Sequence, residues 1–145
     1  MARATIKLTI HCDGASRGNP GPAAAGVVAL DEHYEIVARA AVRLGVMTNN
    51  QAEYHAVWTG MQLAGQLGAT EIEFRLDSEL VVRQLSGEWR IKHAGLRPLA
   101  ERVRAAQPDG TRVRYAHVGR EANVLADRLA NWALDRIDPA DATPD

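Results

Sequence analysis

The sequence predicts a single α/β domain in which a mixed β-sheet lies between layers of helices. Three segments with strand-like alternation follow one another closely near the N-terminus, and segments with helical and strand-like periodicity then alternate along the rest of the chain. The 145 residues have the length of one domain, and 46% of them are hydrophobic, which is enough to build one core.

The first strands lie on either side of a turn rich in glycine and proline. Residues 6–12 alternate apolar and polar side chains, and we expect Asp13 to end this strand. The turn at residues 14–22 has three glycines and two prolines, so its backbone can approach a ligand closely. Residues 23–30 and 34–44 are typical of two further strands, which predicts an antiparallel meander. An aspartate before a glycine is also common in turns, so Asp13 alone indicates either a turn residue or a metal ligand.

A helix with clear start and stop signals follows the third strand. Apolar side chains repeat at helical spacing over residues 52–67, and Gly68 ends the helix. Any of the three polar residues at positions 48–50 can cap it, which places Glu53 in its first turn.

Strands and helices then alternate toward the C-terminus. Residues 71–76 alternate as a strand, after which Asp77 or Ser78 can cap a helix at residues 79–85. A loop is predicted at residues 86–95 and a helix at residues 97–106. They are followed by a strand at residues 112–118, a final amphipathic helix at residues 121–137 and a disordered tail at residues 138–145.

Composition limits the possible functions. Seventeen basic and 18 acidic residues give a formal net charge of -1, so a polyanion would have to be bound by local features rather than by an overall positive field. The single Cys12 rules out an internal disulfide and suits a reducing compartment. The sequence shows neither a leader-like start nor an apolar run long enough to cross a membrane. We therefore expect a soluble, cytoplasmic monomer with no obligate protein partner.

Four acidic residues are candidates for a metal site: Asp13, Glu53, Asp77 and Asp127. Three have other ordinary interpretations, since Glu53 favours the helix macrodipole, Asp77 can cap a helix and Asp127 can lie on a solvated helix face. Carboxylates without paired Cys or His suit Mg²⁺ or Mn²⁺ rather than zinc. Two such ions about 3.5–4 Å apart would serve phosphoryl-transfer chemistry.

The context of these acids resembles ribonuclease HI. The matching phrases occur in family order at residues 13–22 (DGASRGNPGP), 48–53 (TNNQAE), 77–79 (DSE) and 120–127 (REANVLAD). The resemblance extends from about residue 6 to about residue 134. It implies the ribonuclease H-like fold, a five-stranded mixed sheet with helices on both faces, in a catalytic domain at residues 1–137. It also implies sequence-independent hydrolysis of the RNA strand of RNA/DNA hybrids, leaving 5′-phosphate and 3′-hydroxyl ends.

The resemblance assigns roles to the four acids. Asp13 would bridge two Mg²⁺ or Mn²⁺ ions, Glu53 and Asp77 would complete the ion on the leaving-group side, and Asp127 would hold the ion that activates water. The same resemblance implies substrate contacts for a group of small polar residues. Asn19, Asn49 and Asn50 match minor-groove positions, Thr48 matches a position that grips a phosphate of the DNA strand, and Ser16 is counted with them. Short amides suit the wide, shallow minor groove of RNA-containing duplexes, where 2′-hydroxyls are displayed.

Family members often carry a histidine in a loop before the last acid, and two residues here could take its place. Counting back from Asp127 without gaps gives His117, whereas matching the phrase at residues 118–121 gives Arg120. We favour Arg120 as the catalytic-loop residue, because His117 is expected to belong to the preceding strand.

Two further differences from the family pattern concern substrate binding. Glu79 stands where the family often has a substrate-contacting amide, which places a negative charge near a polyanion. The long basic protrusion of many members is absent. Trp89 and Lys92, with neighbouring cations, are predicted to form a reduced handle on the DNA strand, although a solvated loop with a packed tryptophan fits equally well. A small handle predicts weak, salt-sensitive binding.

Two other functions remain to be weighed against this one. A nuclease or integrase of the same fold acting on DNA would carry the same acids, but the asparagine phrase matches hybrid-specific members. A non-catalytic hybrid-binding module is disfavoured because all four acids are present.

Overall fold

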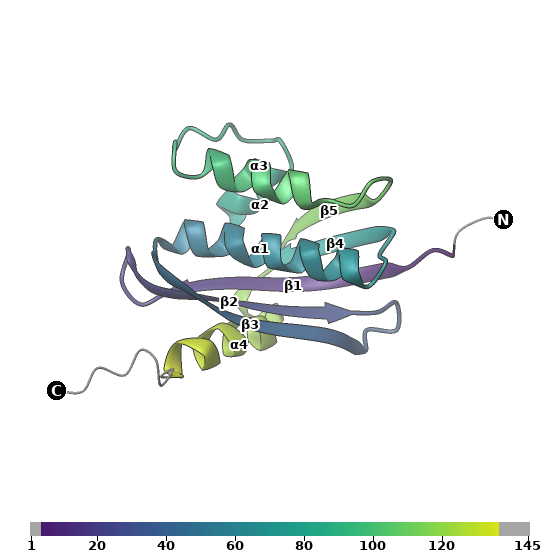
Figure 1. The fold of residues 1–145 in the computed structure, drawn as a ribbon, viewed down its shortest axis with the longest axis horizontal. Helices are drawn as coiled ribbons and strands as arrows, with labels where there is room; N and C mark the ends of the chain where they lie inside the picture. Colours follow the sequence, from purple (N-terminus) through teal and green to yellow (C-terminus); the bar gives the residue numbers. More distant parts are fainter. Residues whose placement is uncertain (1–3, 137–145) are drawn as a thin grey trace.

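A computed structural model describes residues 4–136 as a five-stranded mixed sheet with helices on both faces (Figure 1), so the predicted fold class is confirmed. The strand order is β3-β2-β1-β4-β5. The strands are β1 (Lys7–Ser16), β2 (Gly21–Leu30), β3 (Ile36–Met47), β4 (Glu71–Leu76) and β5 (Arg112–His117). The first three pair antiparallel, as the meander prediction requires, whereas β4 and β5 run parallel to β1.

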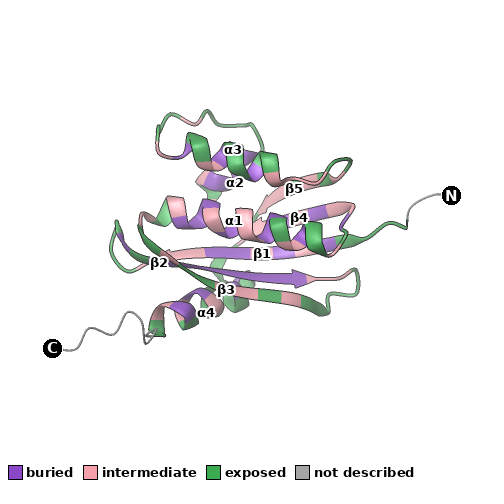
Figure 2. Ribbon diagram, viewed as in Figure 1, coloured by how far each residue is buried: buried purple, intermediate pink, exposed green. Residues whose placement is uncertain are grey.

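Helices cover the two faces unequally. Helices α1 (Asn49–Gln66), α2 (Glu79–Leu85) and α3 (Arg97–Ala106) lie on one side, and α4 (Val124–Asp135) lies alone on the other (Figure 1). The main core lies between α1, its neighbours and the sheet, where the buried residues of β1, β2 and β4 meet the inner side of α1 (Figure 2). Within it, the Tyr54 hydroxyl donates a 2.6 Å hydrogen bond to Gln84 Oε1 and ties α1 to α2. Across residues 4–136, no helix is both long enough and apolar enough to cross a membrane.

The start of α1 corrects one prediction. Of the three possible caps, the structure uses Thr48, whose hydroxyl accepts from the Gln51 N–H at 3.2 Å while the Gln51 side chain accepts from the Thr48 N–H at 2.9 Å. This reciprocal capping box sets the helix start two residues earlier than a cap at Asn50 would. Glu53 is therefore the fifth helical residue and does not lie in the first turn, as the sequence had suggested.

Several element boundaries also differ from the predictions: β2 begins two residues earlier than predicted, β3 ends three residues later and β5 ends one residue earlier. β1 continues to Ser16, so Asp13 lies inside the strand rather than at its end. The third strand begins later than predicted, because Tyr34 has a positive φ of 59° and belongs to the hairpin turn. The predicted final helix is split into a 3₁₀ turn (Arg120–Ala122) and α4, since the side chain of Asn123 bonds to β1 instead of extending one continuous helix. The predicted tail at residues 138–145 lies outside the described residues.

Gly26 is what allows α4 to lie directly on β2. A Cβ atom at this position would lie 1.9 Å from the Ala126 carbonyl oxygen and 2.7 Å from the Ala130 nitrogen. Replacing Gly26 with Ala must therefore displace α4 backbone, and we expect the free energy of unfolding to fall by about 2–3 kcal/mol.

Gly65 provides the matched control in a denaturant-unfolding experiment. It lies inside α1, and a Cβ there would be 3.5 Å from Pro108 Cγ, an ordinary contact. Gly65→Ala should leave the stability unchanged or raise it by up to about 1 kcal/mol. Equal effects of the two substitutions would show that α4 does not approach β2 as closely as described.

Candidate active site

Four carboxylates from four elements line one open pocket of about 700 Å³. β1 supplies Asp13, α1 supplies Glu53, the end of β4 supplies Asp77 and α4 supplies Asp127. The fold brings them together because β1 and β4 are parallel neighbours, α1 approaches β1 at Gly14, and α4 approaches β2 at Gly26, the residue that pairs with Asp13. We call this the carboxylate pocket.

Three of the four acids form a tight cluster. One carboxylate oxygen from each of Asp13, Glu53 and Asp77 lies within 4.8 Å of the others. Gly14 makes this possible, because a Cβ atom there would lie 2.2 Å from the carbonyl carbon of Ala52 and would push α1 away. The Gly14 N–H donates to Glu53 Oε1 at 2.5 Å, which fixes one oxygen of that side chain. Asp127 also lines the pocket; its side chain is exposed, and its hydrogen bond to Asp13 helps to raise the pKa of that carboxyl.

Burial makes the negative charges of this cluster costly. Burial and the neighbouring Glu53 and Asp77 carboxylates together raise the pKa of Asp13 to about 10, and burial is the largest of these causes. Burial likewise raises the pKa of Glu53 to about 7, against the lowering effect of the Gly14 N–H. Among the described residues, Glu53 Oε2 is buried without a hydrogen-bond partner. A divalent cation would satisfy this oxygen and compensate the charges, so the donor set fits a hard ion such as Mg²⁺ or Mn²⁺.

Asn123 holds the start of α4 against β1. Its Nδ2 donates to the Cys12 carbonyl at 2.8 Å, and its Oδ1 lies 3.1 Å from His11 Nδ1. The residue is only 2% exposed, which makes these bonds a buried tie between two elements. Because Cys12 precedes Asp13 and Asn123 precedes α4, the tie fixes the position of Asp127 relative to Asp13.

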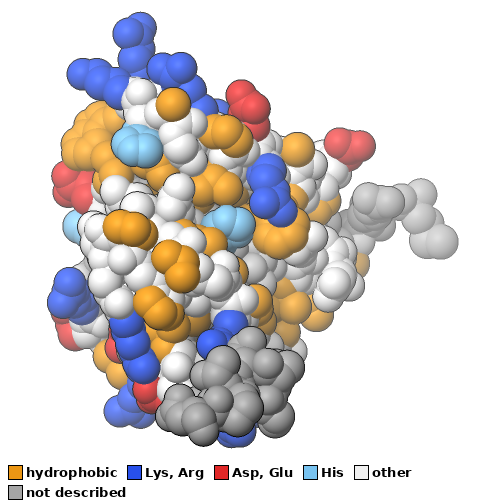
Figure 3. Space-filling model, turned by 60° about the vertical axis from the view of Figure 1, so that its left-hand side comes forward, with side chains coloured by type: hydrophobic (Ala, Val, Ile, Leu, Met, Phe, Trp, Pro, Cys, Tyr) orange, Lys and Arg blue, Asp and Glu red, His pale blue; other side chains and the backbone are white. Residues whose placement is uncertain are grey.

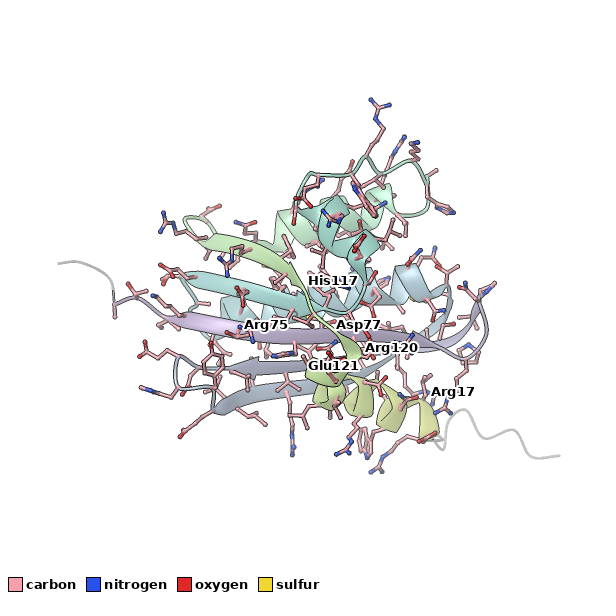
Figure 4. The ribbon with its side chains drawn as sticks, turned by 180° about the vertical axis from the view of Figure 1, so that it is seen from behind. Arg17, Arg75, Asp77, His117, Arg120 and Glu121 are labelled. Atoms are coloured by element: carbon pink, nitrogen blue, oxygen red, sulfur yellow. The ribbon has the colours of Figure 1, made fainter. Side chains whose placement is uncertain are left out.

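The loop between β5 and α4 brings Arg120 to the carboxylates. Figure 4 shows Asp77, Arg120 and Glu121 gathered where β4 ends and α4 begins, and Arg120 Nε is 3.9 Å from Asp77 Oδ2. His117 belongs to β5, as the sequence predicted, although the strand ends at this residue rather than at Val118, and His117 Nδ1 lies 3.8 Å from Glu79 Oε2. Arg120 lines the carboxylate pocket, whereas His117 and Glu79 do not.

The small polar residues form a connected group at the rim of the pocket. The Ser16 N–H donates to Asn49 Oδ1 at 3.1 Å, and the Asn49 N–H donates to Asn19 Oδ1 at 3.0 Å. Ser16, Asn49 and Asn50 line the pocket, and both Asn49 and Asn50 are exposed. Asn19 and Thr48 do not line the pocket, and Thr48 caps α1.

The predicted handle lies outside the pocket, in the loop between α2 and α3. Trp89 is 43% exposed, and the Arg83 guanidinium carbon is 5.4 Å from its ring centroid. Lys92 is exposed in the same loop, together with Arg90. Lys and Arg side chains gather at the top of the face shown in Figure 3, and the loop and α3 lie at the top of Figure 1.

Sequence reasoning missed three residues at the site. Ser78 and Glu121 line the pocket, and Asn123 positions α4. The sequence predicted Ser78 only as a possible helix cap. It does cap the helix, since its hydroxyl accepts from the Val81 N–H at 3.4 Å. Glu121 and Asn123 stand beside Arg120 in the matched phrase, so their place in the motif was the available signal.

Comparisons with known proteins agree with this arrangement. The family described as "Reverse transcriptase-like" matches residues 11–133. Bifunctional protein Rv2228c of Mycobacterium tuberculosis is 43% identical over 143 residues, which cover 96% of this chain and 39% of that protein. Ribonuclease HI of Halobacterium salinarum is 45% identical over 129 residues, which cover 89% of this chain and 65% of that protein. This chain thus spans about two fifths of the mycobacterial relatives.

Two solved structures extend the likeness to three dimensions. The N-terminal RNase H domain of Rv2228c superposes with a TM-score of 0.86 at 42% identity, covering 90% of this chain and 95% of that one. LC11-RNase H1 in complex with an RNA/DNA hybrid superposes with a TM-score of 0.84 at 34% identity. The match covers 88% of this chain and 96% of that one. The chain therefore belongs to the ribonuclease HI family.

Proposed function

We propose that this chain is a divalent-metal-dependent endoribonuclease that hydrolyses the RNA strand of RNA/DNA hybrids without sequence preference. The observation that carries the proposal is the cluster of three carboxylates within 4.8 Å, set in an open pocket with Asn49 and Asn50 on its rim. The relatives named ribonuclease HI and the neighbour crystallised with a hybrid support the same activity.

Asp13, Glu53, Asp77 and Asp127 would hold two Mg²⁺ or Mn²⁺ ions when the substrate is bound. Such ions activate water, stabilise the leaving oxygen and so permit phosphodiester hydrolysis with 5′-phosphate and 3′-hydroxyl products. Asp13 interacts with the carboxyl groups of Glu53, Asp77 and Asp127, which supports a bridging role. Asp127 is exposed, lines the same pocket and interacts with the Asp13 side chain, which supports its proposed role at the ion that activates water.

The rim residues would read the duplex. The exposed amides of Asn49 and Asn50 suit 2′-hydroxyls and base edges in a shallow minor groove. The Ser16 N–H orients the Asn49 side chain by donating to its Oδ1, and Asn19 Oδ1 accepts from the Asn49 backbone N–H. Thr48 would contact a phosphate of the DNA strand. Glu79 is paired with Arg83 Nε at 3.5 Å, so the repulsion that its charge would exert on the substrate is partly offset.

Arg120 is expected to matter more than His117. Arg120→Ala should slow turnover about tenfold, because this exposed side chain lies beside Asp77 where water and product pass. His117→Ala should change turnover by less than about twofold, since His117 contacts Glu79 rather than the pocket. Steady-state kinetics on a hybrid would check this, and the reverse order of effects would show that His117 takes the loop role.

The handle is expected to act on binding rather than chemistry. Replacing both Trp89 and Lys92 with Ala should raise KM for the hybrid about fivefold to tenfold at unchanged kcat, and should flatten the salt dependence of KM. Arg112→Ala, an exposed cation at the start of β5, is the matched control. If KM and its salt dependence match the parent chain, Trp89 and Lys92 form only a solvated loop.

Strand labelling tests the proposed reaction. A hybrid labelled on either strand should lose only its RNA strand in Mg²⁺, and the products should be ligatable without prior phosphorylation. Cleavage of the DNA strand would instead indicate a DNA-directed nuclease of the same fold.

We also expect the chain to act as a cytoplasmic monomer. Its only cysteine, Cys12, is a buried free thiol, which suits a reducing compartment.

A further inference from the structure

Helix α4 leaves part of the sheet face on its side uncovered. It lies across β2 at Gly26 and begins only at Val124, so the face of β2 and β3 continues beyond its first turn without a covering helix (Figure 4). Two adjoining cavities open there, of about 130 and 190 Å³, and they share Val28 and Leu125 as lining residues. We call them the α4 groove.

The α4 groove is apolar at its floor. The smaller cavity is lined by Val28, Ile36, Leu125 and Leu129, of which Ile36 is 52% and Leu125 50% exposed. Apolar side chains on facing elements at this exposure are typical of a contact surface rather than of isolated surface residues. Each cavity has room for about one aliphatic or aromatic side chain.

The rim of the groove is positively charged. Arg39 of β3 and Arg128 of α4 line the smaller cavity on either side, and both are exposed. Within residues 4–136, neither has an acidic partner, in contrast to Arg17, Arg75 and Arg83, which all form ion pairs. The nearest acid among the lining residues is Glu121, at the far end of the larger cavity.

From these observations we infer that the α4 groove binds an acidic peptide segment of another protein that carries apolar side chains. The two cavities receive the apolar side chains, and the guanidinium groups of Arg39 and Arg128, which have no acidic partner within residues 4–136, receive the carboxylates. A nucleic acid fits the groove less well, because phosphates would gain from the arginines but would leave the apolar cavities unfilled. The larger cavity shares Glu121 and Val124 with the carboxylate pocket, but neither residue is proposed to hold metal or substrate, so this inference does not rest on the proposed function.

Fluorescence anisotropy with a labelled octapeptide of aspartate and leucine tests this inference. The experiment uses the full chain in chelator, so that cleavage plays no part. We expect saturable binding that weakens about tenfold in Arg39→Glu/Arg128→Glu and in Leu125→Ser. Arg112→Glu, the same charge change at the start of β5, should bind like the parent chain. Peptides with serine for leucine or lysine for aspartate should bind at least about tenfold more weakly.

Three results would overturn the inference. The first is equal affinity of the parent chain and the double arginine variant for the peptide, with thermal unfolding showing that both are folded. The second is displacement of the peptide by a DNA duplex together with loss of duplex binding in the double variant, which would assign the groove to nucleic acid. The third is a dimer in light scattering that Leu125→Ser dissociates, which would assign it to a second copy of the chain.

Discussion

Replacing Asp13 with Asn is expected to abolish cleavage of the hybrid and to make the protein more stable. The amide removes the charge at the centre of the carboxylate cluster, on which the binding of both proposed ions depends, so kcat should fall at least about 10³-fold. In the absence of metal, burial beside Glu53 and Asp77 raises the pKa of Asp13 to about 10, so near neutral pH the folded protein holds a proton that the unfolded chain has released, which costs folding free energy. Each kcal/mol relieved raises Tm by roughly 3 °C in a domain of this size, and we expect an increase on the order of 3–6 °C.

Asp109→Asn is the matched control for this substitution. It makes the same chemical change at an exposed turn position and should alter neither kcat nor Tm. Hybrid binding by Asp13→Asn, measured by anisotropy, should stay within about threefold of the parent chain, because Asn49, Asn50 and the handle are unchanged. Retained cleavage in Asp13→Asn would contradict the metal-site assignment, and an unchanged Tm would contradict the buried-charge account.

The stability of the protein in chelator is expected to fall as pH rises. The pKa values of Asp13 and Glu53 are raised from 3.8 and 4.5 to about 10 and about 7, so the folded protein keeps protons that the unfolded chain has released. Their contribution to the free energy of unfolding is fully present below about pH 4 and is lost as pH rises, through about 7 for Glu53 and about 10 for Asp13. The slope is on the order of 1.4 kcal/mol per pH unit for each such proton.

Urea unfolding between pH 6 and pH 9 would measure this slope. Asp13→Asn should remove most of it, since Asp13 is the group that keeps its proton over this range. Millimolar Mg²⁺ should stabilise the parent chain more at pH 9 than at pH 6, because binding the ion requires the carboxylates to lose their protons. Parallel pH profiles for the parent chain and the variant would show that the cluster does not hold these protons.

Much of the fold could be predicted because local signals agreed with the final arrangement. Alternation over residues 6–12 and 71–76, helical spacing over residues 52–67 and the glycine at residue 68 each marked an element that the structure contains. Periodicity could not predict the residues at which these strands and helices end. β1 extends past Asp13 because its pairing with β2 continues to Ser16, and such pairing is a long-range property.

The candidate site was predictable as a set of residue types but not as a geometry. Spacing in the sequence gave no reason for Asp13, Glu53 and Asp77 to lie within 4.8 Å, which follows from the parallel pairing of β1 and β4 and from the close approach of α1 at Gly14. The tie from Asn123 to the Cys12 carbonyl joins positions 111 residues apart, and no local pattern could show it.

The most direct test of the account is cleavage of one labelled RNA strand presented in three forms: paired with DNA, paired with RNA, and single. Each form would be incubated with Mg²⁺, with Mn²⁺ or with chelator. We predict cleavage of the hybrid alone, and only when a divalent ion is present. Binding of the hybrid without cleavage in every metal would contradict the account and would identify the chain as a non-catalytic hybrid-binding module, whereas cleavage in chelator would exclude the carboxylates as a metal centre.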